Sequence, residues 1–191
     1  MLKPIIEEQE FSGINFIKEA LVKGEYENCT FINCDFQNLH LSNFDFIDCE
    51  FEDCNLSNVK LNNTSMKQVQ FNDCKLLGVN FGECNPFLFS VSFDDCFLHL
   101  ATFYKLKMKA TTFKNCNLKE ADFTETDLTS AVFDNCELVA AIFENTILEK
   151  ADLRNAQNFS INPELNRIKK AKFSLHNVKG LLDKYNIEIE N

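Results

Sequence analysis

The chain has 191 residues, of which 45% are hydrophobic, so it is long enough to form one domain with a filled core. Its formal net charge of -10 disfavours direct binding to nucleic acid or to anionic membranes, and it suits a basic surface on a partner protein. The first residues lack the apolar stretch of a signal peptide, and no apolar run could cross a bilayer, so we expect a cytoplasmic protein without membrane contact.

A period of five residues organises most of the chain. Every fifth residue is apolar from Phe11 to Phe81, and the pattern resumes from Leu88 to Leu153 after a slip of two residues. This spacing fits neither the 3.6-residue period of an amphipathic helix nor the two-residue period of a strand. It indicates a repeating turn, as in a solenoid.

A second periodic position lies two residues before each apolar centre and is mostly small, while polar residues fill the other positions. The triplet Ala121-Asp122-Phe123 is an example. This motif resembles the pentapeptide repeat family over residues 11–156. The resemblance implies an all-β solenoid over residues 1–173. Its form would be a right-handed quadrilateral parallel β-helix, with four pentapeptides in each twenty-residue coil and about eight coils.

Residues twenty apart should then lie above one another, and the sequence supports this arrangement. One column of apolar centres, counted with twenty-two residues across the slip, is almost entirely phenylalanine: Phe11, Phe31, Phe51, Phe71, Phe93, Phe113, Phe133, Leu153 and Phe173. The period of five residues requires only apolar centres and not phenylalanine in particular. The phenylalanine column therefore supports the twenty-residue coil and the register across the slip, and it extends the pattern beyond residue 156.

The nine cysteines all occupy the small inward position, and six of them share one column: Cys34, Cys54, Cys74, Cys96, Cys116 and Cys136. We interpret them as small buried hydrophobic residues. Zinc needs four ligands around one point, which stacked residues do not offer, and a catalytic thiolate needs access to substrate. No phosphate loop, nucleophile elbow or metal motif occurs elsewhere, so we expect no cofactor, no metal and no enzymatic activity.

Two segments interrupt the repeat. In residues 82–92, Pro86 cannot donate to a ladder and two extra residues must bulge, which makes Phe87 and Phe89 candidates for an exposed partner surface. The alternative is that both rings pack under the bulge. Residues 155–170 lose the apolar centres, which predicts an irregular coil.

The last segment, residues 174–191, has a different pattern. Its apolar residues recur first at helical spacing and then alternate, so we expect a short helix followed by a strand. The segment could cap the open end of the solenoid or pair with a second copy. It is similar to the carboxyl-terminal segment of the quinolone-resistance pentapeptide proteins, the Qnr and MfpA type, in which this segment forms a two-fold dimer interface. The resemblance implies a homodimer through these side chains: Leu175, Val178, Leu181, Leu182, Tyr185 and Ile187.

The same resemblance implies a partner. In that group a long acidic rod imitates duplex DNA and binds DNA gyrase or topoisomerase IV. Many Qnr proteins also carry long loops that are important for drug protection. This chain has only the two-residue slip in their place, as in the MfpA-like members, which lack such loops.

Acidic residues concentrate in the first half of the chain. Residues 1–95 carry 16 acidic and 6 basic side chains, whereas residues 96–191 carry 13 of each. Eight acids and no Lys or Arg lie between Gly24 and Val59, and we expect them to form a partner surface: Glu25, Glu27, Asp35, Asp45, Asp48, Glu50, Glu52 and Asp53.

Two functions remain open at this point. The first is a non-enzymatic protein-interaction scaffold with an unidentified protein partner. The alternative is a DNA-mimicking regulator of gyrase or topoisomerase IV that also protects against quinolones. The repeat specifies architecture far better than it specifies the partner.

Overall fold

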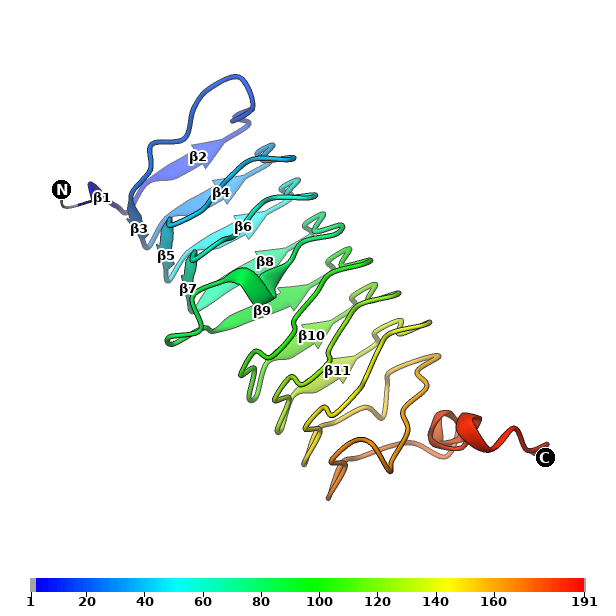
Figure 1. The fold of residues 1–191 in the computed structure, drawn as a ribbon. Helices are drawn as coiled ribbons and strands as arrows, with labels where there is room; N and C mark the ends of the chain where they lie inside the picture. The colour runs from blue at the N-terminus through cyan, green and yellow to red at the C-terminus, as the bar shows by residue number, and fades with distance from the viewer. Residues whose placement is uncertain (1–2, 191) are drawn as a thin grey trace.

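The computed structural model describes residues 3–190, and its strands form two parallel ladders that run along an elongated body (Figure 1). One sheet has four strands in the order β1-β3-β5-β7, and the other has seven in the order β11-β10-β9-β8-β6-β4-β2. The strands are β1 (Ile5–Glu7), β2 (Glu10–Ser12), β3 (Glu25–Glu27), β4 (Thr30–Ile32), β5 (Asp45–Ile47), β6 (Glu50–Glu52), β7 (Ser65–Lys67), β8 (Val69–Asn72), β9 (Val91–Asp94), β10 (Thr112–Lys114) and β11 (Val132–Asp134). The fold is therefore an all-β parallel solenoid.

The register of the ladders confirms the predicted coil length. Phe11 pairs with Phe31, twenty residues later, and the same step repeats down to β8. Between β8 and β9 the step becomes twenty-two, because Phe71 pairs with Phe93. Isolated parallel bridges continue the ladder after β11, as far as Lys172. The two-residue slip is thus taken up in the connection before β9, and the strands on either side stay aligned.

Stacked phenylalanine rings fill the centre of the solenoid. Along the predicted column, Phe93, Phe113 and Phe133 are fully buried, and their ring centroids lie 5.2 and 4.9 Å apart in nearly parallel planes. A second column stacks in the same way, with Phe103 and Phe123 5.0 Å apart. Rings of the two columns meet edge to face. Each buried ring contributes about 1.5–3 kcal/mol by leaving water, so the aromatic columns are a main source of stability.

The small inward residues do more than fill space, because many of them donate a hydrogen bond to the coil before. The thiol of Cys54 donates to the carbonyl of Phe31 at 3.2 Å, and that of Cys74 donates to the carbonyl of Phe51 at 3.3 Å. The hydroxyl of Thr126 makes the equivalent bond to Phe103 at 2.8 Å. Cysteine and threonine therefore share a role at this position that alanine cannot fill.

Most coils turn through residues with positive φ, spaced five apart. In the coils from β3 to β8 these residues are Asn, Asp or Gly with one exception, Gln68, and Asn and Gly adopt this conformation at least cost. In the later coils the same position is often occupied by a residue that disfavours it, as at Leu100, Lys105, Ala110 and Ala140.

The carboxyl-terminal segment differs from the expected helix and strand. It forms two 3-10 helices, Val178–Leu181 and Asp183–Tyr185, and residues 186–190 form no strand. Gly180 lies against the solenoid so closely that an added Cβ would come within 2.2 Å of the carbonyl oxygen of Phe159, and this contact fixes the path of the chain. Asn186 then adopts a left-handed conformation that ends the second helix. A third 3-10 helix, Phe81–Glu83, precedes the slip, and no helix within residues 3–190 has the length and apolar character needed to cross a membrane.

Candidate functional site

Seven of the eight predicted acids lie on two successive coils and are spread over both sheets, since β3 and β5 belong to one sheet and β6 to the other. Strands β3, β5 and β6 carry five of them, and the other two follow β5 and β6 directly in turns. Parallel pairing places Glu25 beside Asp45, and the ladder stacks the coils on which the others lie. We call this group the acidic surface: Glu25, Glu27, Asp45, Asp48, Glu50, Glu52 and Asp53. Asp35 is separate, because it pairs with Asn15 and Asn55 in a different column.

Neighbouring carboxyl groups influence one another within the acidic surface. A side-chain hydrogen bond with Glu25, followed by desolvation and by the charges of Glu25, Glu7 and Asp48, raises the pKa of the Glu27 carboxyl. One lysine compensates part of this charge, since Lys3 forms an ion pair with Asp45. The acidic surface therefore keeps an excess of negative charge.

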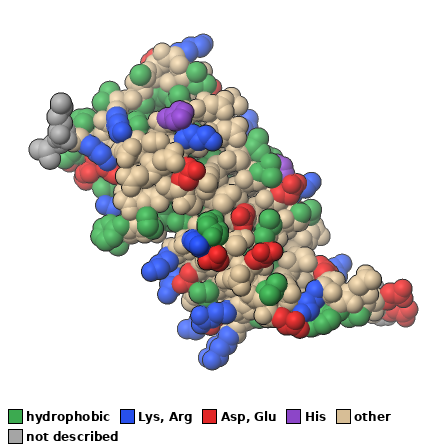
Figure 2. Space-filling model, in the orientation of Figure 1, with side chains coloured by type: hydrophobic (Ala, Val, Ile, Leu, Met, Phe, Trp, Pro, Cys, Tyr) green, Lys and Arg blue, Asp and Glu red, His purple; other side chains and the backbone are tan. Residues whose placement is uncertain are grey.

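Basic side chains gather toward the other end of the rod, where many are already paired. Figure 2 shows Lys and Arg side chains grouped at its lower left, along the coils that follow β9. Arg167 contacts Glu149 at 2.7 Å, and Lys172 contacts Asp152 at 3.5 Å. The two ends of the molecule thus differ in charge, with the negative excess toward the amino-terminal end.

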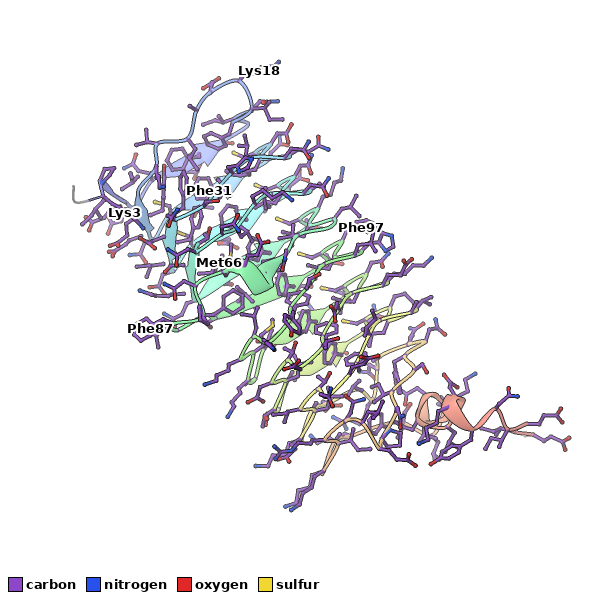
Figure 3. The ribbon with its side chains drawn as sticks, viewed as in Figure 1. Lys3, Lys18, Phe31, Met66, Phe87 and Phe97 are labelled. Atoms are coloured by element: carbon purple, nitrogen blue, oxygen red, sulfur yellow. The ribbon has the colours of Figure 1, made fainter. Side chains whose placement is uncertain are left out.

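The slip exposes one of its two phenylalanines and buries the other. Phe87 is 67% exposed and points away from the rod (Figure 3), and the carboxamide oxygen of Asn85 accepts a hydrogen bond from its backbone N–H at 3.0 Å. Phe89 is only 8% exposed and packs edge to face on Phe81. The expectation that Phe89 lies on a partner surface is therefore wrong, because its ring fills the core beneath the bulge. Leu88, which the sequence placed inward, is exposed instead.

The carboxyl-terminal segment leaves most of its apolar side chains in solvent. Leu175 is 94% exposed, and Val178, Tyr185 and Ile187 are also exposed. Leu181 and Leu182 are half-buried, and Leu181 packs against the core.

Asn177 holds this segment to the end of the solenoid. Its amide nitrogen donates to the carbonyls of Leu153 at 2.7 Å and Ala156 at 2.9 Å, while its oxygen accepts from the backbone of Ser174 at 2.9 Å. The apolar pattern of the sequence gave no signal for this role. The cap is thus held by a polar side chain, and the apolar ones remain available for contact.

The thiols are inaccessible. All nine cysteines are buried and unpaired, and burial raises the pKa of Cys49 to about 11. Within residues 3–190 no group of three or more His, Cys, Asp or Glu residues could hold a metal ion. Two hollows lie instead at the two ends of the rod. One has a volume of about 910 Å³ beside Asn177, and the other about 560 Å³ beside Phe11.

The chain is similar to known proteins both in sequence pattern and in fold. The sequence profile described as a pentapeptide repeat region matches residues 25–86 and 87–178. No curated protein matches the chain by sequence. Among solved structures, the full-length plasmid-mediated fluoroquinolone resistance protein QnrB1 is similar with a TM-score of 0.54 and 17% identity, covering 96% of this chain and 100% of that one. HetL, a pentapeptide repeat protein involved in heterocyst differentiation regulation in a Nostoc cyanobacterium, gives a TM-score of 0.37 and 15% identity, over 87% of this chain and 86% of that one.

Proposed function

Since this chain belongs to the pentapeptide repeat family, we propose that it is a non-enzymatic scaffold in the cytoplasm that presents its acidic surface to a basic surface of a partner protein. As part of this proposal, we infer from the family resemblance that the solenoid is right-handed and four-sided and has about eight coils. The observation that carries it is the gathering of seven carboxylates on β3, β5, β6 and the turns after them. Among the described residues, no group of three or more His, Cys, Asp or Glu side chains could hold a metal ion.

Electrostatic attraction is the main contribution we assign to the acidic surface. Exposed charges speed the approach of an oppositely charged partner and set its orientation, more than they increase final affinity. Phe87 adds an exposed ring on the slip, next to the strand β7. We therefore expect binding that weakens steeply with salt and retains an apolar component.

A type II topoisomerase is the second candidate partner. The observation in its favour is the likeness to QnrB1, which extends over 96% of this chain with a TM-score of 0.54. A rod that imitates DNA would carry negative charge along its length, whereas residues 96–191 hold 13 acidic and 13 basic side chains. We therefore place this candidate second.

Homodimerisation through the carboxyl-terminal segment is part of the proposal. The support is the exposure of Leu175, Val178, Tyr185 and Ile187 on one short segment at the end of the rod. Each large apolar side chain that becomes fully buried across a two-fold axis would contribute about 1.5–3 kcal/mol. Such a dimer would hold the two acidic surfaces at opposite ends of the assembly.

The experiment that tests the function compares two matched double variants. Glu50→Gln with Glu52→Gln removes two charges from the acidic surface, and Glu120→Gln with Glu144→Gln removes two exposed charges from the later coils. Affinity capture from the native cell extract identifies the partner, and its purified form is then titrated at several salt concentrations. Weaker binding and a shallower salt dependence for the first variant only are expected, and equal behaviour of both variants would refute the acidic surface.

The topoisomerase candidate is tested with purified gyrase and topoisomerase IV. Supercoiling of relaxed plasmid and decatenation are measured as the protein is added, with and without a fluoroquinolone. Inhibition or drug protection that is lost in the Glu50→Gln, Glu52→Gln variant supports this candidate. No effect at large molar excess on the host's own enzymes excludes it and leaves the scaffold with another partner.

A further inference from the structure

The amino-terminal end of the solenoid presents an open strand edge. Strands β1 and β2 are the outermost members of their sheets. Thr30 donates its N–H to the carbonyl of Gln9 at 2.9 Å, and Gly13 donates to the carbonyl of Ile32 at 2.9 Å. Because neighbouring residues in a strand direct their backbone groups to opposite sides, the N–H and C=O groups of Glu10 and Ser12 face outward. Within residues 3–190 no strand lies on that side of β2.

The neighbouring strand β1 is partly closed by its own chain. The side chain of Gln9 donates to the backbone carbonyl of Glu7 at 3.2 Å, so one outward acceptor of β1 is already satisfied. Among the described residues, no side chain makes an equivalent hydrogen bond to the outward backbone groups of β2. An extended segment approaching this end would therefore pair with β2.

Beside this edge lies a hollow of about 560 Å³, lined mainly by apolar side chains. Its walls include Ile5 and Val22, each 61% exposed. The ring of Phe11 stacks on Phe31 at 4.8 Å, but no ring of the described residues stacks on its other face, whereas Phe31 has a stacked ring on each side. The end of the aromatic column is thus an apolar surface on which a further side chain could pack.

The charges around the hollow specify the occupant. Its charged lining residues are Glu7 and Glu19, and Glu10 stands on the open edge itself. Three lysines lie near this end: Lys3 is paired with Asp45, Lys18 lies at the outer tip of the loop between β2 and β3 (Figure 3), and Lys23 is exposed and does not line the hollow. A second copy meeting this end would bring two sets of carboxylates together. A basic strand would neutralise them.

We propose that the amino-terminal end binds an extended, basic and partly apolar segment of a protein partner, which adds a strand to β2. The incoming strand places a large apolar side chain over Phe11 and a Lys or Arg over Glu10, and it exchanges backbone hydrogen bonds with Glu10 and Ser12. This site lies on the open edge of β2, whereas the acidic surface lies on β3, β5 and β6; the two adjoin where Glu7 pairs with Glu27.

The test uses the full chain and a fluorescein-labelled peptide in which lysine alternates with phenylalanine and valine. Ser12→Pro removes an outward N–H and places a ring in the path of the incoming strand, while the ladder to β4 keeps all its bonds. Ser12→Ala is the matched control, because it keeps the N–H. We expect Ser12→Pro to weaken peptide binding at least about tenfold relative to Ser12→Ala, with unchanged circular dichroism and melting temperature.

Two further measurements do not depend on a variant. Hydrogen exchange should show new protection of the Glu10 and Ser12 amides when the peptide binds, and N-methylation of the peptide backbone should abolish binding. Equal affinity of the Ser12→Pro and Ser12→Ala proteins overturns the proposal, as does peptide binding without protection of these two amides. Protection that grows with protein concentration in the absence of peptide also overturns it, because the occupant is then a second copy.

Discussion

Replacing one ring in the middle of the aromatic column tests how the solenoid is held together. Phe113 lies 5.2 Å from Phe93 and 4.9 Å from Phe133, both in stacked geometry. Leucine is common at equivalent centres, so Phe113→Leu keeps the coil and removes four aromatic pairs, the two stacked ones and the edge-to-face pairs with Phe103 and Phe123. At about 0.5–1.5 kcal/mol per aromatic pair, the variant should lose about 2–6 kcal/mol of unfolding free energy.

The matched control is Phe11→Leu, at the amino-terminal end of the same column. Phe11 has one stacked partner, Phe31 at 4.8 Å, and two edge-to-face partners, Phe16 and Tyr26, so three pairs predict a loss of about 1.5–4.5 kcal/mol, smaller than that of Phe113 by one stacked pair. Guanidinium unfolding followed by circular dichroism measures both variants, with the slope against denaturant as a check that the mode of unfolding is unchanged. Equal losses for the two variants would refute the reasoning, since stability would then not follow the number of stacked neighbours.

Three further predictions follow from burial and charge. A thiol reagent should label the cysteines only after denaturation, because all nine are buried and the pKa of Cys49 rises to about 11; rapid labelling of the native protein would contradict this. Light scattering should report a dimer for the intact protein and a monomer for Leu175→Asp, which changes an exposed side chain of the proposed interface, whereas a stable monomer of the intact protein would mean that the segment only caps its own rod. Hydrogen bonds from Arg154 lower the pKa of Asp152 to about 2, so its stabilisation should be complete above its usual pKa and be lost as pH falls toward about 2. Acid unfolding of Asp152→Asn should lack this contribution, and an unchanged acid profile would argue against the ion pair.

The regular part of the fold could be predicted because one constraint repeats along the chain. The interval of twenty residues places Phe31 over Phe51, and the twenty-two-residue step between Phe71 and Phe93 appears in both the sequence and the ladder. The twenty-residue interval also predicts that most residues of the acidic surface lie on successive coils. A periodic core therefore allows contacts between residues far apart in the chain to be predicted from the sequence.

The departures from the repeat could not be predicted because they depend on single contacts. Helical spacing in residues 175–185 predicted a regular helix, but Gly180 must lie against Phe159 and the chain bends there into 3-10 turns. Phe87 and Phe89 are identical in type, and only the path of the bulge decides that one ring is exposed and the other buried. The role of Asn177 depends on its hydrogen bonds to the carbonyls of Leu153 and Ala156 and to the backbone N–H of Ser174. These groups come together only when the end of the rod has formed.

The conformation of the turns has a consequence for how the rod assembles. In the coils from β3 to β8, Asn, Asp and Gly favour the positive φ of the turn before any neighbouring coil is present. Leu100, Lys105 and Ala110 disfavour it, so their coils gain this geometry only when an adjacent coil already offers its strand. Folding should therefore begin in the amino-terminal coils and advance one coil at a time toward the carboxyl terminus. That direction matches the order in which a ribosome releases the chain, so each new coil would find its template already formed.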